Sequence, residues 1–350
     1  MTSRTASWEL IPWHEVDWQA LEALRDRSVF QTPAWLAFLA ETQDGTPVVA
    51  RLGPSGAPAA YFSGVVVKRY GIKILGSPFA GWTTAYMGFN AETQEGREAA
   101  FAALPKLAFG MLGCMHVEIM DRRAAPSQGA RAGFYERTHH TFQTDLTCSE
   151  DELFAAMSSA CRRCIRKAEK SGVTVVECSG AQADEEAFAQ QYYEQLREVF
   201  AKDGLVPTYG KDRVTALIRH LRGTGDLLLL RALDPDGRCI GTSIYVGRHD
   251  LAYFWGNASY RDGQILRPNE ALHWYAMRYW KSRGVTIFDW GGGGEYKVKY
   301  GVRRVAIPWL RRSRYPVLEF LRSQAQRAFA ARQKAAALAA ARFGARSASE

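Results

Sequence analysis

The chain carries one order of secondary-structure signals twice, and this repetition narrows the folds open to it. In the first half, three strand-like segments precede a helical pattern at 97–112, a glycine and an alternating strand at 115–119. In the second half, three strand-like segments precede a helix at 269–282, a glycine and a strand at 285–290. Glycine commonly ends a helix, and alternation of apolar and polar residues marks a strand. The repetition therefore predicts a duplicated α/β domain.

Length and composition agree with two folded domains. A chain of 350 residues with 47% apolar and 23% charged residues has globular proportions. We place the domains at 1–145 and 146–312, followed by a basic, Ala- and Arg-rich C-terminal helix and tail at 313–350. Nine Lys and Arg residues but only two Glu fall in 311–350, so most of the +9 net charge belongs to this tail. Net charge alone is therefore weak evidence for a nucleic-acid partner.

The cysteines and the apolar segments indicate a reducing compartment. The six cysteines are scattered, and the one close pair, Cys161 and Cys164, falls in a helical pattern without a second pair to complete a zinc site. We therefore expect no bound metal. No apolar run reaches the roughly 18 residues of a membrane span, and residues 1–18 lack the apolar core of a signal peptide. The expectation is a cytoplasmic protein with no integral membrane segment.

A run of four glycines at 291–294 follows the strand at 285–290, and Lys297 and Lys299 come soon after it. Four glycines cost much backbone entropy, and glycine suits a place where the backbone approaches a ligand closely. The alternative is a flexible hairpin loop with solvated lysines. The equivalent point of the first half, after Met120, has no such run. The chemistry is therefore expected in the second half.

A dense basic cluster lies on the helical pattern that opens the second half. Its members are Arg162, Arg163, Arg166, Lys167 and Lys170. The planar guanidinium of Arg suits phosphate, and neighbouring positive charges on one helix repel one another unless an anion is bound. The cluster is therefore a candidate phosphate-binding surface. The alternative is a solvated helix face.

The predicted order of elements is similar to the N-acetyltransferase (GNAT) fold, and two copies in one chain resemble the Fem family of aminoacyl-tRNA-dependent peptidyl transferases. Three segments carry this resemblance: 30–35 (FQTPAW), the end of the basic helix at 162–173, and the glycine-rich close at 288–302. Val298 and Val302 replace two phenylalanines of the family pattern, and the helical-hairpin arm of some members is absent. Acyltransferases of cellulose and exopolysaccharide operons share most of these segments.

The resemblance implies an α/β fold of two tandem GNAT-like domains, each a mixed, mostly antiparallel sheet flanked by helices. The first domain is expected to be degenerate and supporting, and the second catalytic. The implied activity moves an amino acid from aminoacyl-tRNA, the donor, to an amine of a small peptide or peptidoglycan (cell-wall) precursor, the acceptor, and forms an amide bond. The enzyme is thus a tRNA-dependent aminoacyltransferase that needs no resident cofactor.

The resemblance also assigns residues. Lys299 matches the Fem lysine that holds the donor end or stabilises developing negative charge. Asp289 and Glu295 are the nearby carboxylates, which we expect at the rim of the same cleft, although Asp289 also suits a turn cap. The strands at 241–246 and 251–257 are expected to splay and expose a backbone N–H to the acyl carbonyl. The residues placed at the acceptor cleft are Tyr253, Trp255 and Asn257. Ordinary sheet core is the alternative for the two aromatics.

Two other functions stay open. Acetyl-CoA enzymes of this fold carry a glycine-rich loop ahead of a helix that binds pyrophosphate, and the matching segment here, 260–268, has one Gly at the wrong spacing. This counts against CoA, yet an acyl-CoA-dependent N-acyltransferase acting on a sugar or polysaccharide precursor remains the alternative. A binding module that keeps the fold without catalysis is the third reading.

Overall fold

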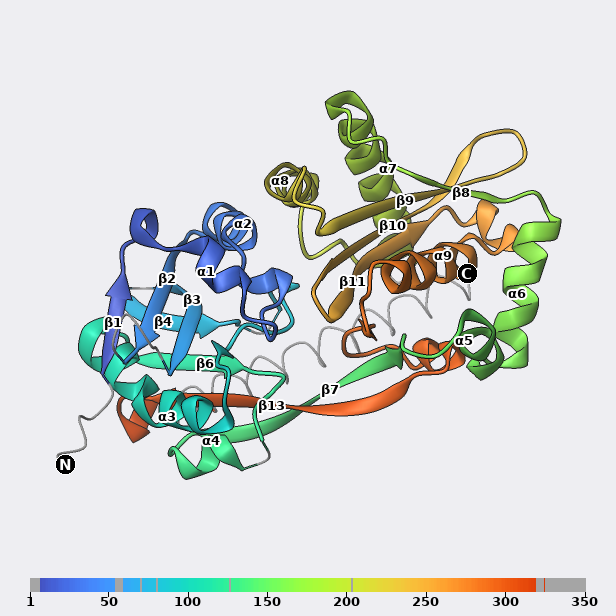
Figure 1. Ribbon diagram of the computed structural model, residues 1–350. Coiled ribbons are helices and arrows are strands. Elements are labelled where there is room, and N and C mark those ends of the chain that lie inside the picture. The colour runs from blue at the N-terminus through green and yellow to red at the C-terminus, as the bar shows by residue number, and fades with distance from the viewer. Residues whose placement is uncertain are drawn as a thin grey trace.

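The computed structural model describes residues 7–318 and 324, apart from 54–58, 70, 80, 126 and 203. The described residues form two similar halves that share one continuous mixed sheet (Figure 1). The strand order is β1-β2-β3-β4-β6-β13-β7-β12-β11-β10-β9-β8, and β5 pairs with β3. Most of the predicted C-terminal helix and tail lies outside the described residues.

The first half builds a mostly antiparallel sheet with helices against it. Its strands are β1 (Trp8–Ile11), β2 (Gly45–Leu52), β3 (Ala60–Arg69), β4 (Ile72–Ser77), β5 (Phe89–Asn90) and β6 (His116–Met120). Its helices are α1 (Trp18–Glu22), α2 (Pro33–Gln43), α3 (Gln94–Pro105) and α4 (Gln128–Arg131), with 3-10 turns at Trp13–Glu15 and Val29–Gln31. The predicted helix at 97–112 is interrupted, because a π-helical segment, Lys106–Met111, follows Pro105.

The second half repeats this plan with longer helices. Its strands are β7 (Tyr135–Asp145), β8 (Thr174–Glu177), β9 (Leu227–Leu233), β10 (Cys239–Arg248), β11 (Leu251–Ser259), β12 (Ile287–Asp289) and β13 (Arg303–Ser313). Its helices are α5 (Glu150–Ala156), α6 (Ser159–Lys170), α7 (Gln182–Ala201), α8 (Lys211–Leu221) and α9 (Pro268–Ser282), with 3-10 turns η4 (Asp262–Leu266) and η5 (Glu295–Tyr300). A capping box of Ser149 and Glu152 begins α5.

One parallel strand pair in each half reveals the duplication. In the first half β4 runs parallel to β6 and α3 connects them; in the second half β11 runs parallel to β12 and α9 connects them. The other strand pairs of the described sheet are antiparallel. The predicted α/β class with two tandem GNAT-like units is therefore confirmed.

Two long strands join the halves, and neither was predicted. Figure 1 shows β7 and β13 running side by side beneath both halves. Because β13 pairs with β6 on one side and with β7 on the other, the end of the described chain returns to the first half. A buried cluster also crosses the junction, where the Phe30 ring packs edge-on against Tyr253 at 5.4 Å between centroids. The two halves therefore share both a sheet and a core.

Candidate active site

The sheet opens between β11 and β12. These parallel strands pair over three residues that end with Tyr253 opposite Asp289, after which β12 stops and β11 continues to Ser259. Strands β10 and β11, in contrast, stay paired along their length. The prediction that 241–246 and 251–257 are the splayed pair is therefore wrong. The opening forms where β12 ends, because the glycines that follow it turn the chain away from β11.

A β-bulge marks the β11 side of this opening. Ile244 of β10 pairs with Gly256 while the next residue, Tyr245, pairs with Phe254, so Trp255 is the extra residue of β11. A bulge disrupts the ladder locally and re-aims the residues around it, and bulges are common beside active sites. The opening thus has an irregular strand on one side and the glycine run on the other.

The glycine run folds around Lys297. This side chain is buried, and its Nζ donates hydrogen bonds to the carbonyl oxygens of Trp290 at 2.5 Å and Gly292 at 3.2 Å. The ammonium also lies 5.7 Å from the centroid of the Phe254 ring, across the opening. Burial lowers the pKa of Lys297 to about 8, and the nearby Asp289 charge opposes that shift. Sequence reasoning assigned no role to Lys297, although its position after the glycines was a signal.

The free energy of unfolding is expected to rise with pH between about 8 and 10.5 through Lys297. In that range the unfolded chain still holds the lysine's proton and the folded protein does not. The gain in stability is therefore complete above the unfolded pKa, and it is lost as the pH falls through the folded pKa. The rise amounts to about 3 kcal/mol. Urea unfolding at pH 8 and pH 10 measures it. Lys297→Met should remove the rise, and an equal rise in that variant would contradict the assignment.

Gly291 has no room for a side chain, and Gly292 and Gly294 of the same run are also crowded. The φ of Gly291 is +70°, and an added Cβ would lie 2.7 Å from the Tyr253 hydroxyl oxygen. Gly293 has a φ of +73° but open space around it, so it is a matched control. Gly291→Ala is expected to cost about 2–4 kcal/mol of unfolding free energy and Gly293→Ala about 1–2 kcal/mol. Chemical denaturation tests the difference, and equal losses would rule out the steric role of Tyr253.

Lys299 joins the beginnings of two helices. Its Nζ forms an ion pair with Oε1 of Glu270 at 2.6 Å, in the first turn of α9, and its carbonyl oxygen accepts a hydrogen bond from the backbone N–H of Ser158 at 2.9 Å. Ser158 is the N-cap of α6. The Lys299 side chain is 31% exposed, whereas Lys297 is enclosed. Of the two lysines, Lys299 is therefore the more accessible to solvent.

The N-terminus of α9 already holds a carboxylate. Pro268 occupies the first turn and has no backbone N–H to offer, and Arg267 before it adopts a left-handed conformation with φ of 63°. Glu270 is buried in the same turn. A helix N-terminus attracts anions through its free N–H groups and its dipole. Here Glu270, in the first turn of α9, supplies negative charge near that end and pairs with Lys299.

Asp289 lies in the interior rather than at a rim. Its carboxylate accepts hydrogen bonds from the Tyr86 hydroxyl at 2.8 Å, Thr141 Oγ1 at 2.6 Å, Gln143 Nε2 at 2.8 Å and the Gly291 N–H at 2.7 Å. Burial raises the pKa of Asp289, and these donors oppose that rise. The bond to Gly291 is the turn cap that the sequence allowed. The other bonds fix β12 to β7 and to the first half.

Glu295 is exposed as the first residue of η5 and has no hydrogen bond or ion pair with a described residue. It stands between the glycine run and the two lysines. The structure thus brings Glu295 and Lys299 to the same turn and places Asp289 beneath it. Of the predicted carboxylates, Glu295 is the one free to meet a substrate.

The basic cluster divides into inward and outward members. Arg162 Nη1 donates to the carbonyl oxygens of Ala155 at 2.7 Å and Met157 at 2.5 Å, which closes the end of α5. Arg163, Arg166 and Lys167 are exposed, and the Arg166 guanidinium lies 5.2 Å from the centroid of a Phe ring on α5. The outward face of α6 is therefore basic, while Arg162 serves the fold.

The three residues predicted at the acceptor cleft belong mainly to the sheet. Tyr253 is packed against the first half, and burial raises the pKa of its hydroxyl. Trp255 is buried beside two tyrosine rings, with its indole N–H unpartnered within the described residues. Asn257 Nδ2 donates to the Thr242 carbonyl at 3.1 Å and to Ser243 Oγ at 2.9 Å. These contacts match the sheet-core alternative, and a role at the acceptor remains a prediction.

Neither metal clusters nor membrane spans are found in the part of the chain that the structure describes. No group of three or more His, Cys, Asp or Glu side chains there is placed to hold a metal ion. Every described helix is too short or too polar to cross a bilayer.

Comparison with known proteins supports this architecture. Residues 155–300 match the family model of the acetyltransferase (GNAT) domain. The fold is similar to that of FemX, with a TM-score of 0.67 at 14% identity over 86% of this chain and 96% of that one. L-PGS from Bacillus licheniformis gives a TM-score of 0.51 at 14% identity, covering 84% of this chain and 96% of that one. A search of curated protein sequences gives no match.

A tandem GNAT protein from the clavulanic acid biosynthesis pathway is also similar, with a TM-score of 0.50 at 12% identity over 89% of this chain and 99% of that one. At these identities the likeness concerns the fold. The predicted resemblance to the Fem fold is confirmed at this level. This chain therefore has a tandem GNAT fold similar to that of FemX, and residues 155–300 of its second half match the family model of the acetyltransferase (GNAT) domain.

Proposed function

We propose that this chain transfers an aminoacyl group from aminoacyl-tRNA to an amine of a peptide or peptidoglycan precursor. The observation that carries the proposal is the acidic first turn of α9, where Glu270 pairs with Lys299. In CoA-dependent enzymes of this fold that helix begins at the pyrophosphate. A dianion placed here would meet the Glu270 carboxylate and, at Pro268, no N–H donor. This favours a donor whose phosphates bind elsewhere.

The reaction asks little of the protein because the donor ester is already activated. The amine nitrogen attacks the ester carbonyl carbon, the bond from that carbon to the ribose oxygen breaks, and the amine's proton ends on that oxygen. Negative charge develops on the carbonyl oxygen, and preorganised donors stabilise it. Lys299 and backbone N–H groups of the bulged β11 supply them. Glu295 is placed to accept the amine's proton.

The outward face of α6 supplies contacts for the RNA end of the donor. Arg163, Arg166 and Lys167 are exposed there, and the backbone bond from Ser158 to Lys299 fixes this helix to the opening. Lys and Arg bind the phosphate backbone without reading sequence, and such binding weakens as salt increases. The face therefore suits the acceptor end of a tRNA.

The choice of donor is the test of this proposal. Purified protein is incubated with a peptide that carries a free amine and with either a labelled aminoacyl-tRNA or a labelled acyl-CoA. Label is expected in the peptide from charged tRNA. Label from acyl-CoA, and none from any charged tRNA, would overturn the proposal.

An acyl-CoA-dependent N-acyltransferase acting on a sugar or polysaccharide precursor is the second candidate. Two exposed arginines, Arg261 and Arg267, flank η4 just ahead of α9 and are available to a phosphate. The match of residues 155–300 to the acetyltransferase (GNAT) domain also favours it. A rise in melting temperature with acetyl-CoA would support this candidate, and an unchanged value would weigh against it.

A further inference from the structure

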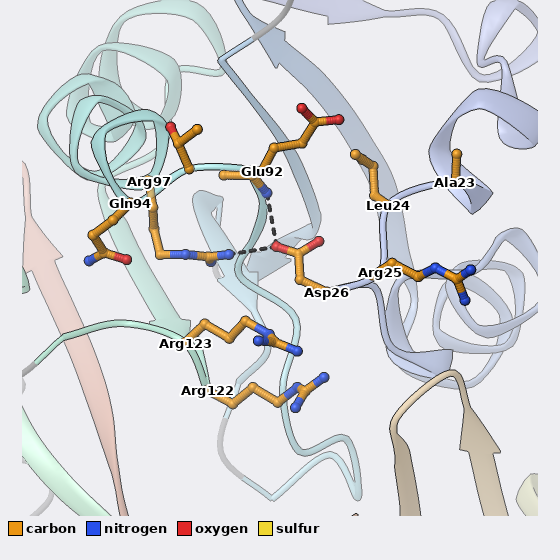
Figure 2. Close-up of a pocket in the computed structure, with 11 residues that line it drawn as sticks. Ala23, Leu24, Arg25, Asp26, Glu92, Gln94, Arg97, Arg122 and Arg123 are labelled. Atoms are coloured by element: carbon orange, nitrogen blue, oxygen red, sulfur yellow. Dashed lines mark hydrogen bonds and ion pairs between the residues drawn. The ribbon is translucent and has the colours of Figure 1, made fainter. Parts of the chain in front are cut away.

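A polar cavity of roughly 700 Å³ lies at the edge of the first half. Its walls come from the end of α1, the beginning of α3 and the segment after β6. Figure 2 shows Arg122 and Arg123 extending into this space, while Arg25 stands on the opposite wall with its guanidinium directed away from them. A second cavity of roughly 740 Å³ shares Arg25 and Arg123 with the first and reaches the end of α9 at Arg283. We call the joined cavities the arginine groove, after Arg25, Arg122, Arg123 and Arg283.

The arginine groove contains more positive charge than the carboxylates paired with its arginines neutralise. Arg122 and Arg123 both pair with the single carboxylate of Asp250, in the turn between β10 and β11. Arg25 and Arg283 form no ion pair with a described residue, and the Arg283 guanidinium lies over the Tyr279 ring at 4.5 Å from its centroid. Guanidinium groups left without a carboxylate at the wall of a cavity are ready to bind an anion.

The acidic residues near the groove do not cancel this excess. Asp26 bonds to the Arg97 guanidinium and to the backbone N–H of Ala91, which are interactions within the first half. Glu22 and Asp226 both pair with Arg248. Figure 2 shows the Glu92 carboxylate directed away from the arginines. Arg25 and Arg283 therefore remain as lining charges that have no ion pair with a described residue.

We propose that the arginine groove binds a small molecule carrying a phosphate or diphosphate group. The Asp250 carboxylate already supplies one negative charge to two arginines. A ligand with a single carboxylate would bring no more negative charge than Asp250 does. A phosphate brings about two charges and three acceptor oxygens, which the forked guanidinium groups bind in pairs. Cavities of this size hold metabolite-sized ligands. Because Arg25 belongs to the first half and Arg283 to the second, the ligand binds across the junction.

This site is separate from the opening between β11 and β12. Arg283 follows the last residue of α9, whereas Glu270 lies in its first turn. A helix of 15 residues is roughly 22 Å long. A ligand in the groove therefore does not touch Lys299, and the inference stands whether the acyl donor is a tRNA or a CoA thioester.

Calorimetric titration with inorganic pyrophosphate tests the proposal, with a nucleoside diphosphate in a parallel titration to show whether the base adds affinity. Binding is expected for the intact protein, and the double variant Arg25→Ala/Arg283→Ala should weaken it at least about tenfold. Neither arginine has an ion pair to lose, and an unchanged melting temperature confirms that the variant is folded. Arg163→Ala, an exposed arginine on α6, is the matched control and should bind like the intact protein.

Three results would overturn the proposal. The first is no binding of either diphosphate at millimolar concentration. The second is equal affinity in the intact protein and the double variant. The third is a loss in the Arg163→Ala control instead, which would move the anion site to the basic face of α6. Acyl-transfer activity is measured separately, so a failure here leaves the proposed function untouched.

Discussion

Replacing Lys299 with Ala is expected to lower the rate of acyl transfer about 100-fold while the protein stays folded. Lys299 is a partly exposed cation of η5, and its ion pair with Glu270 and the backbone bond from Ser158 hold it beside the first turns of α9 and α6. Removing a preorganised donor from the site of developing charge raises the barrier by about 3 kcal/mol. The rate of label transfer to the peptide under saturating donor measures the loss.

Two further variants separate catalysis from folding. Lys299→Arg keeps a positive charge beside Glu270 and should restore stability more fully than activity, because a planar guanidinium does not present its donors as an ammonium does. Glu270→Gln keeps the lysine and removes its anchor, so a smaller loss is expected. Full activity in the Lys299→Ala variant would exclude a catalytic role for Lys299, whereas no activity in the intact protein would favour the non-catalytic binding module.

Replacing Asp289 with Ala is expected to cost about 3–5 kcal/mol of unfolding free energy. The variant leaves four donors without their acceptor: the hydroxyls of Tyr86 and Thr141, the Gln143 amide and the Gly291 N–H. All four are buried with the carboxylate, and a buried donor without a partner carries its full desolvation penalty. The midpoint of chemical denaturation should therefore fall well below that of the intact protein.

Glu295→Ala is the matched control for this experiment. Glu295 is also a carboxylate of the segment after β12, but it is exposed and bonds to no described residue, so a change within about 0.5 kcal/mol is expected. The opposite outcome for Asp289→Ala, an unchanged denaturation midpoint with activity lost, would make Asp289 a catalytic group. The two variants thus decide which of these carboxylates serves the fold and which serves a substrate.

The repeated units were predictable because their signals are local. The glycine that ends each connecting helix and the strand that follows are set by neighbouring residues, and the structure has them in both halves. Strands β7 and β13 escaped prediction for the same reason. The segment 135–145 is mostly polar, and the segment 303–313 has arginines at both ends and Pro308 within it. Their extended form comes from pairing with each other over a long sequence separation.

In the candidate site, too, local signals were predictable from the sequence and long-range contacts were not. Lys299 was predictable from a motif. Its partner Glu270 was not, because it lies at the start of α9, far from Lys299 in the sequence. The role of Asp289 depends on Tyr86, which is 203 residues away in the chain. From the sequence alone, Lys297 is indistinguishable from a surface lysine. The structure shows the glycine run folded around its ammonium. Residue types and spacing therefore locate the turn, and tertiary contacts decide which of its charges is buried and which faces a substrate.

The most direct test of aminoacyl transfer is the mass of the product. A short peptide with one free amine is incubated with the protein and a charged tRNA, and the peptide is then analysed by mass spectrometry. We expect a mass gain of one amino-acid residue, in a linkage that resists mild alkali as an amide does, and its loss in the Lys299→Ala variant. A peptide that gains mass only when acyl-CoA is supplied, or at the same rate with Lys299→Ala, would contradict the account.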